Sequence, residues 1–129
     1  MARVCCLAGI DTTLVPMFVA IFEAAGESRL AAVARLNVRE LGRLRPNLLV
    51  CDVDASEQDA LELLRQIRFV LPDCLIAVYT GITDRKWLLA CHLAGANCVL
   101  SKESNERQLT RGLSNTLRIG CDTDPHFAV

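Results

Sequence analysis

The chain has 129 residues, which is enough for one domain with a hydrophobic core and too few for two full domains. Hydrophobic residues make up 52% of it and charged residues 22%, a composition that excludes an intrinsically disordered protein. The 14 Lys and Arg residues against 15 Asp and Glu residues give a net charge of -1, so the basic excess typical of a nucleic-acid-binding protein is missing.

The sequence also lacks membrane and export signals. No apolar run reaches the ~20 residues that a membrane-spanning helix needs. The longest run, residues 14–25, is interrupted by Pro16 and Glu23. The first residues lack the charged segment, long apolar core and small-residue cleavage site of a signal peptide. We therefore expect a soluble cytoplasmic protein without membrane contact.

Seven cysteines are many for a chain of this length. Their number is odd, most lie inside apolar runs, and no C-x-x-C pattern occurs. The two histidines, His92 and His126, have no ligand spacing with any cysteine pair. We therefore expect reduced, buried thiols and no metal site. A redox sensor is the alternative, with Cys91 and Cys121 as the most exposed cysteines.

Short apolar runs alternate with helical patterns up to about residue 119, which predicts five strands and five helices. In chain order, the expected elements are a strand over 3–7, a helix capped at 11–13 and ending at 25, a strand over 29–34, a helix capped by Asn37 and stopping before Pro46, a strand over 47–51, a helix over 57–70, a strand over 74–79, a helix capped by Asp84 and ending at 94, a strand over 97–100, and a helix over 104–118 capped by Ser104.

Strands that are joined through helices run parallel, with right-handed crossovers. The pattern therefore predicts an α/β fold, a doubly wound five-stranded parallel sheet with helices on both faces. Residues 1–119 are expected to form one domain, and residues 120–129 a C-terminal tail or the start of a linker. In such folds the functional groups lie at the carboxyl ends of the strands.

Polar side chains follow three of the expected strands. Asp52 follows the strand over 47–51, Thr80 follows the strand over 74–79, and Lys102 closely follows the strand over 97–100. A carboxylate, a hydroxyl and an ammonium at neighbouring strand ends predict a phosphoryl site. The carboxylate would accept the group, Thr80 would bond a phosphoryl oxygen, and Lys102 would neutralise charge.

The runs LLVCDVDASEQDALELLRQIR, AVYTG and LAGANCVLSK resemble the receiver (CheY-like) domain of two-component response regulators. The resemblance extends from residue 3 to about residue 118 and implies a flavodoxin-like strand order 2-1-3-4-5 and a signalling role without enzymatic activity. It matches Asp52 to the phosphoacceptor, Thr80 to the switch hydroxyl and Lys102 to the family's lysine. The segment from Lys102 onward, with Glu103 in place of a common proline, is similar to NarL/LuxR-class transcription regulators.

Three parts that make and read the phosphoryl signal depart from the family pattern. Ala8 and Gly9 stand where receivers carry the acidic pair that holds Mg²⁺, Val99 replaces an aromatic residue, and Ala60 replaces a glycine. Mg²⁺ prefers octahedral oxygen coordination with one or more carboxylates, so Asp52 alone makes a poor site. The sequence therefore predicts an atypical, or pseudo-, receiver without a cofactor, a metal or Mg²⁺-dependent phosphorylation.

Two alternatives stay open. A carboxylate from Asp11 or Asp54 would restore the Mg²⁺ site, which would give a competent receiver that a histidine kinase phosphorylates on Asp52. The other alternative is an anion, ligand or redox sensor in the vacated pocket. There the loss of two carboxylates leaves Lys102 either to hold an anion or to pair directly with Asp52.

The helix after Asp84 is apolar nearly all round, which indicates deep burial or a partner surface. We expect its Leu89, Ala90 and Leu93 to face the sheet. The remaining side chains predict a protein-partner or homodimer surface on the fourth helix, fifth strand and fifth helix. Its expected members are Trp87, Leu88, Cys91 and Val99. Ordinary packing of Trp87 along the helix is the alternative.

Residues after Cys121 are open to two interpretations. They are either the start of a linker to a helix-turn-helix domain or the end of a stand-alone receiver. Contact with DNA is expected only through such a further domain. The sequence names neither the signal nor the partner.

Overall fold

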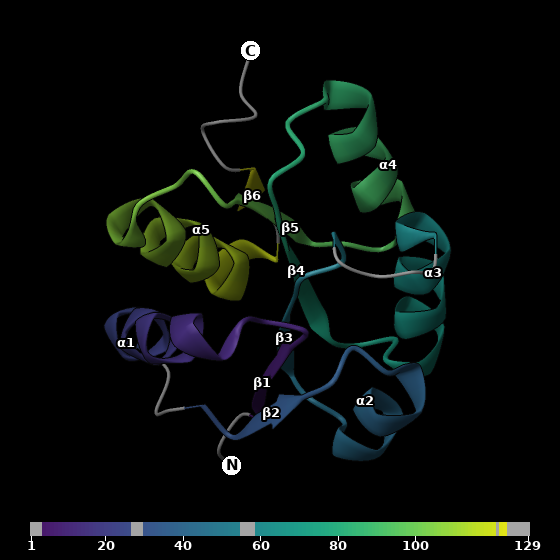
Figure 1. The fold of residues 1–129 in the computed structure, drawn as a ribbon, viewed down its shortest axis with the longest axis horizontal. Coiled ribbons are helices and arrows are strands. Elements are labelled where there is room, and N and C mark those ends of the chain that lie inside the picture. The colour runs from purple at the N-terminus through teal and green to yellow at the C-terminus, as the bar shows by residue number, and fades with distance from the viewer. Residues whose placement is uncertain (1–3, 27–29, 55–58, 121, 124–129) are drawn as a thin grey trace.

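A parallel β-sheet forms the centre of the computed structural model, which describes residues 4–26, 30–54, 59–120 and 122–123 (Figure 1). Neighbouring strands are parallel throughout the sheet. The predicted order 2-1-3-4-5 is confirmed, and a short sixth strand extends the edge beyond the fifth. The strands are β1 (Cys5–Ala8), β2 (Ala32–Ala34), β3 (Leu48–Cys51), β4 (Leu75–Thr80), β5 (Cys98–Ser101) and β6 (Asp122–Thr123).

Helices cover both faces of this sheet, so the doubly wound α/β architecture is confirmed. In Figure 1, α1 and α5 lie on one face, and α2, α3 and α4 lie on the other. The helices are α1 (Val15–Ala24), α2 (Val38–Leu44), α3 (Ala60–Val70), α4 (Arg85–Ala94) and α5 (Glu106–Ile119), with a 3-10 turn η1 (Thr12–Leu14) before α1. Within the described residues, no helix is both long and apolar enough to cross a membrane.

Most helix starts agree with the sequence. Asn37 and Asp84 each accept a backbone N–H of the following turn, so both predicted caps are confirmed. The predicted start of α3 at residue 57 lies outside the described residues, and the described helix follows Asp59. The predicted cap at Ser104 is wrong by one residue. Asn105 caps α5 because it forms a reciprocal capping box with Gln108, which satisfies two backbone groups at once.

Two residues of the expected tail form an edge strand. In β6, Asp122 and Thr123 pair in parallel with Cys98 and Val99 of β5. A polar pair of residues carries no apolar alternation, so the sequence pattern gives no sign of this strand. The division of the chain at residue 119 stays a prediction.

The described cysteines are buried on the two faces of the sheet. All six of them are reduced and buried, namely Cys5, Cys6, Cys51, Cys74, Cys91 and Cys98. Burial raises the pKa of Cys6 to about 11 and the pKa values of Cys74 and Cys91 to about 12. Thiols of this kind stay protonated and unreactive at neutral pH. The expected exposure of Cys91 is therefore wrong, and Cys121 lies outside the described residues.

Arg68 connects several loops at the amino-terminal end of the sheet through hydrogen bonds. Arg68, on α3, donates hydrogen bonds to oxygen atoms that precede β4 and β5. The acceptors are the carbonyl oxygens of Leu71, Pro72, Cys74 and Gly95 and the side-chain oxygen of Asn97, at 2.6 to 3.2 Å. These contacts hold α3, the α3–β4 loop and the α4–β5 turn together at the end of the sheet opposite the strand-end polar residues.

Candidate functional site

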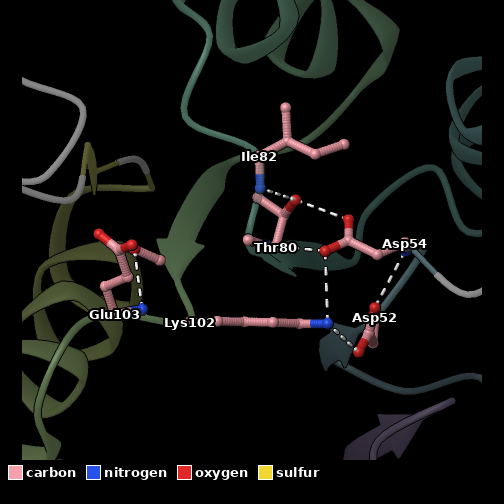
Figure 2. Close-up of polar contacts among 8 residues, drawn as sticks. Asp52, Asp54, Thr80, Ile82, Lys102 and Glu103 are labelled. Atoms are coloured by element: carbon pink, nitrogen blue, oxygen red, sulfur yellow. Dashed lines mark hydrogen bonds and ion pairs between the residues drawn. The ribbon is translucent and has the colours of Figure 1, made fainter.

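The polar residues expected at the strand ends lie together at the carboxyl edge of the sheet (Figure 2). Lys102 Nζ lies 2.7 Å from Asp52 Oδ2 and 3.3 Å from Asp54 Oδ2. The Asp54 carboxylate also accepts hydrogen bonds from Thr80 Oγ1 at 2.6 Å and from the Gly81 N–H at 2.7 Å. Asp54, which the sequence suggests only as a second metal ligand, is therefore the residue that connects the site.

The backbone around β3 brings the two aspartates to the same place. The Asp52 N–H donates to the carbonyl oxygen of Ala8 at 3.1 Å, which ties the end of β3 to the end of β1. The Asp54 N–H then donates to Asp52 Oδ1 at 2.9 Å. Both aspartates lie beyond the end of β3, and Asp54 is in the turn that follows. A second carboxylate so close behind the strand-end aspartate is the sequence signal by which the role of Asp54 could have been found. The Lys102 N–H donates to the Thr80 carbonyl oxygen at 2.9 Å, which sets the position of the lysine stem.

The charges of the site stabilise one another. Burial by itself would raise the pKa of Asp54, but the hydrogen bonds from Thr80 and Gly81 and the charge of Lys102 outweigh it and lower that pKa. Burial would likewise lower the pKa of Lys102, but the neighbouring Asp52 and Asp54 raise it above its ordinary value. At neutral pH, Asp54 is thus a carboxylate and Lys102 an ammonium.

Solved structures similar to this one share its whole architecture. The isolated REC domain of RcsB from Salmonella enterica serovar Typhimurium, with the phosphomimetic BeF3-, has a TM-score of 0.78 at 14% identity, over 99% of this chain and 97% of that one. A LuxR-family two-component response regulator from Aurantimonas sp. SI85-9A1 has a TM-score of 0.76 at 19% identity, over 99% and 94%. A CheY-like receiver domain protein from Methanospirillum hungatei JF-1 has a TM-score of 0.71 at 20% identity, over 92% and 95%. The chain has the receiver fold.

The likeness is one of structure. No family model matches the sequence, and no curated protein matches it. A longer chain of Salmonella typhimurium RcsB, described in connection with DNA interaction, aligns with 98% of this chain at a TM-score of 0.79 and 16% identity. This chain spans 64% of that RcsB chain. The similarity to the longer RcsB chain therefore covers nearly all of this chain but only about two thirds of the regulator.

Magnesium, which the receiver fold implies at this edge, does not fit the side chains present. Ala8 is fully buried. Gly9 has a φ of +70°, and a Cβ atom added to it would lie only 3.0 Å from the Asp52 carbonyl oxygen, so a larger side chain does not fit there without a shift. Asp52 and Asp54 are both paired with Lys102. In the described part of the chain, no group of three or more His, Cys, Asp or Glu residues is arranged to hold a metal ion. In this structure Lys102 supplies the positive charge that neutralises the two aspartates.

Asp11 takes no part in the site. Its Oδ1 atom accepts the N–H of Thr13 at 3.0 Å and the hydroxyl of Thr13 at 2.9 Å, so it caps η1. The side chain is exposed, and these bonds lower its pKa. In this structure Asp11 therefore serves the local turn and does not restore a metal site.

The orientation predicted for α4 is wrong. Cys91 and Val99 are fully buried and therefore cannot belong to an outer surface, whereas Trp87 and Leu88 pack against the core and stay partly exposed. The exposed apolar side chains of α4 are Leu89 at 60% and Leu93 at 80%. On a helix that is apolar nearly all round, hydrophobicity does not decide which face meets the sheet. The small Cys91 and Ala94 lie on the buried face, where they allow α4 to approach the sheet closely.

Proposed function

We propose that this chain is an atypical receiver domain of two-component signalling, which acts through protein contact and without Mg²⁺-dependent phosphorylation of Asp52. The observation that supports this most is the 2.7 Å ion pair between Lys102 and Asp52, at an edge where Ala8 and Gly9 supply no carboxylate. A phosphoryl donor carries negative charge, and a metal ion normally neutralises it as the phosphoryl group is transferred. An aspartate whose charge is balanced by a lysine, without a metal ion, is a poor phosphoryl acceptor. The role is that of a signalling module and not of an enzyme.

Acetyl phosphate and Mg²⁺ test this proposal. We expect the intact mass of the protein to be unchanged after incubation with both, because no metal ion bridges the donor and Asp52. Trp87 fluorescence should also be unchanged by beryllium fluoride. The indole packs against the core cluster that contains Cys51 and Val53, the two neighbours of Asp52, so it would report a rearrangement there.

The Asp52→Ala variant is the control for that experiment. An Mg²⁺-dependent gain of mass in the natural chain that disappears in Asp52→Ala would overturn the proposal. It would favour instead the alternative of a competent receiver that accepts a phosphoryl group on Asp52. Equal, unchanged masses in the two proteins would support the atypical receiver.

We propose further that the exposed apolar side of α4 binds a second copy of this chain, near the edge of the sheet where β6 pairs with the buried β5. Leu89 and Leu93 give α4 the exposed apolar area that an interface core needs. A net charge of -1 adds little electrostatic repulsion between two copies. DNA contact would fall to a further domain, by analogy with the longer RcsB chain.

A double charge substitution tests this interface. We expect the natural chain to sediment as a dimer and the Leu89→Glu/Leu93→Glu variant to sediment as a monomer with an unchanged circular dichroism spectrum, because carboxylates would be buried in the interface. Phe69→Glu is the matched control, since Phe69 is 85% exposed on the neighbouring α3. A monomeric natural chain, or a dimer that survives the double substitution, would contradict the proposal.

A further inference from the structure

Three hydrogen-bond donors converge on the carboxylate of Asp54 (Figure 2). Thr80 Oγ1 donates to Oδ1 at 2.6 Å, and the Gly81 N–H donates to Oδ2 at 2.7 Å. Lys102 Nζ lies 3.3 Å from the same Oδ2. A hydroxyl, a backbone amide and an ammonium aimed at one point are the donors that stabilise an oxyanion. Here the oxyanion that they hold belongs to the protein itself.

The donors are fixed before any ligand arrives. The Ile82 N–H donates a hydrogen bond to Thr80 Oγ1 at 3.0 Å. The Thr80 hydroxyl thus accepts from Ile82 and donates its own proton to Asp54. Thr80 is fully buried, and the Asp54 side chain is 20% exposed. Gly81 follows the last residue of β4, Thr80, which pairs with Ser101 of β5. The donors are therefore in place in this structure, with Thr80 buried and Gly81 and Lys102 open to solvent.

We propose that Asp54 is an internal ligand, which occupies the donors of Thr80, Gly81 and Lys102 in place of a phosphate-like oxyanion. The inference rests on the proposed function, because it gives a reason for the lack of phosphorylation at Asp52. A phosphoryl group on Asp52 would need Thr80 Oγ1 and Lys102 Nζ for its oxygens, and both are engaged by Asp54. The carboxylate holds the end of β4 in the arrangement that a bound anion would produce.

Tethering gives Asp54 an advantage over any free anion. A group attached by a short linker acts on its neighbours at an effective concentration of millimolar or more. Asp54 follows Asp52 by two residues, and its N–H is anchored on Asp52 Oδ1 at 2.9 Å, so little entropy is lost when its carboxylate binds. Free phosphate at ordinary concentrations should not displace it. Removal of the carboxylate should make the donors of Thr80, Gly81 and Lys102 available to phosphate.

Titration with inorganic phosphate, without Mg²⁺ or a phosphoryl donor, tests this inference. The Asp54→Ala variant should bind phosphate about tenfold more tightly than the natural chain, with a saturating shift of the Gly81 amide resonance. The Asp54→Ala/Lys102→Met variant should lose that binding, because the ammonium is gone. The Asp11→Ala variant removes a carboxylate of equal charge outside the site, and it should bind no more tightly than the natural chain.

Two results would overturn the inference. One is equal phosphate affinity in the natural chain and in Asp54→Ala, checked in Asp54→Ser if the alanine variant does not fold. The other is tighter binding that survives Lys102→Met. The outcome is separable from that of the proposed function, because the acetyl phosphate experiment reads a covalent change at Asp52. A natural chain that gains mass with Mg²⁺ refutes the proposed function, whereas unchanged phosphate binding in Asp54→Ala refutes the internal ligand alone.

Discussion

Replacement of Arg68 by alanine is expected to lower the free energy of unfolding by about 3 kcal/mol, because several carbonyl oxygens, most of them partly buried, lose a charged donor. The guanidinium lies 2.6 Å from the Gly95 carbonyl oxygen and 2.7 Å from that of Cys74, so it joins the α4–β5 turn to the start of β4. Asn97 Oδ1 would keep only the Ile76 N–H as a donor. Urea denaturation followed by circular dichroism measures the loss.

Arg65 on the same helix is the matched control. Its ion pair with Glu62 spans 3.4 Å at the surface, with side chains 58% and 54% exposed. Arg65→Ala should therefore cost about 0.5 kcal/mol. Arg68→Lys should recover less than half of the loss, since one ammonium does not reach both sides of the junction as a planar guanidinium does. Equal losses for Arg65→Ala and Arg68→Ala would contradict the structural role of Arg68.

The Lys102→Met substitution should have the second large effect, a loss of roughly 2 kcal/mol in the free energy of unfolding at neutral pH and low salt. In the natural chain the carboxylates of Asp52 and Asp54 lie 2.7 and 3.3 Å from the Lys102 ammonium. The substitution removes this shared positive charge and leaves the two carboxylates without it. The loss is smaller than for a fully buried pair because the Lys102 side chain is 34% exposed. The Asp54→Asn/Lys102→Met variant removes the repulsion and should recover about 1 kcal/mol of coupling. Equal stabilities of the single and double variants would refute this account.

The same pair predicts how the loss depends on pH. The folded state lowers the pKa of Asp54. The stabilisation that Asp54 adds to the folded state is therefore complete above the ordinary carboxyl pKa of about 3.9, and it is lost as the pH falls through the lower pKa of the folded state. Because the folded state raises the pKa of Lys102, its contribution is present below the ordinary value of about 10.4 and disappears as the pH rises through the higher folded value. The stability difference between the natural chain and Lys102→Met should be flat between these limits and shrink outside them.

Four of the five predicted strands agree with the structure to within two residues at each end, whereas the strand predicted over 29–34 begins only at Ala32 and β6 was not predicted. The runs around Leu48–Cys51 and Leu75–Thr80 are almost continuously apolar, as strands covered by helices on both faces must be. Caps at Asn37 and Asp84 were equally legible, because short polar side chains before a helical pattern satisfy its first N–H groups. The order of the sheet followed from the alternation of strands with helices together with the family resemblance.

The orientation of α4 and the contacts of Arg68 could not be read in this way. Leu89 and Leu88 are equal in hydrophobicity, and only packing against α3 and the sheet exposes the first and half-buries the second. Arg68 occupies an ordinary position on an amphipathic helix, and its acceptors lie up to 29 residues away in the chain. Contacts of that range depend on how complete elements stack on one another.

By itself, the sequence determined which chemical groups stand at the strand ends, since the parallel sheet brings Asp52, Thr80 and Lys102 to one edge. It also determined what is missing there, because the side chains of Ala8 and Gly9 carry no carboxylate that could hold a metal ion. Only the tertiary structure decided that Asp54 receives the donors. Thr80 and Asp54 are 26 residues apart, and whether they bond depends on the turn after β3 and on side-chain rotamers that no spacing along the chain specifies.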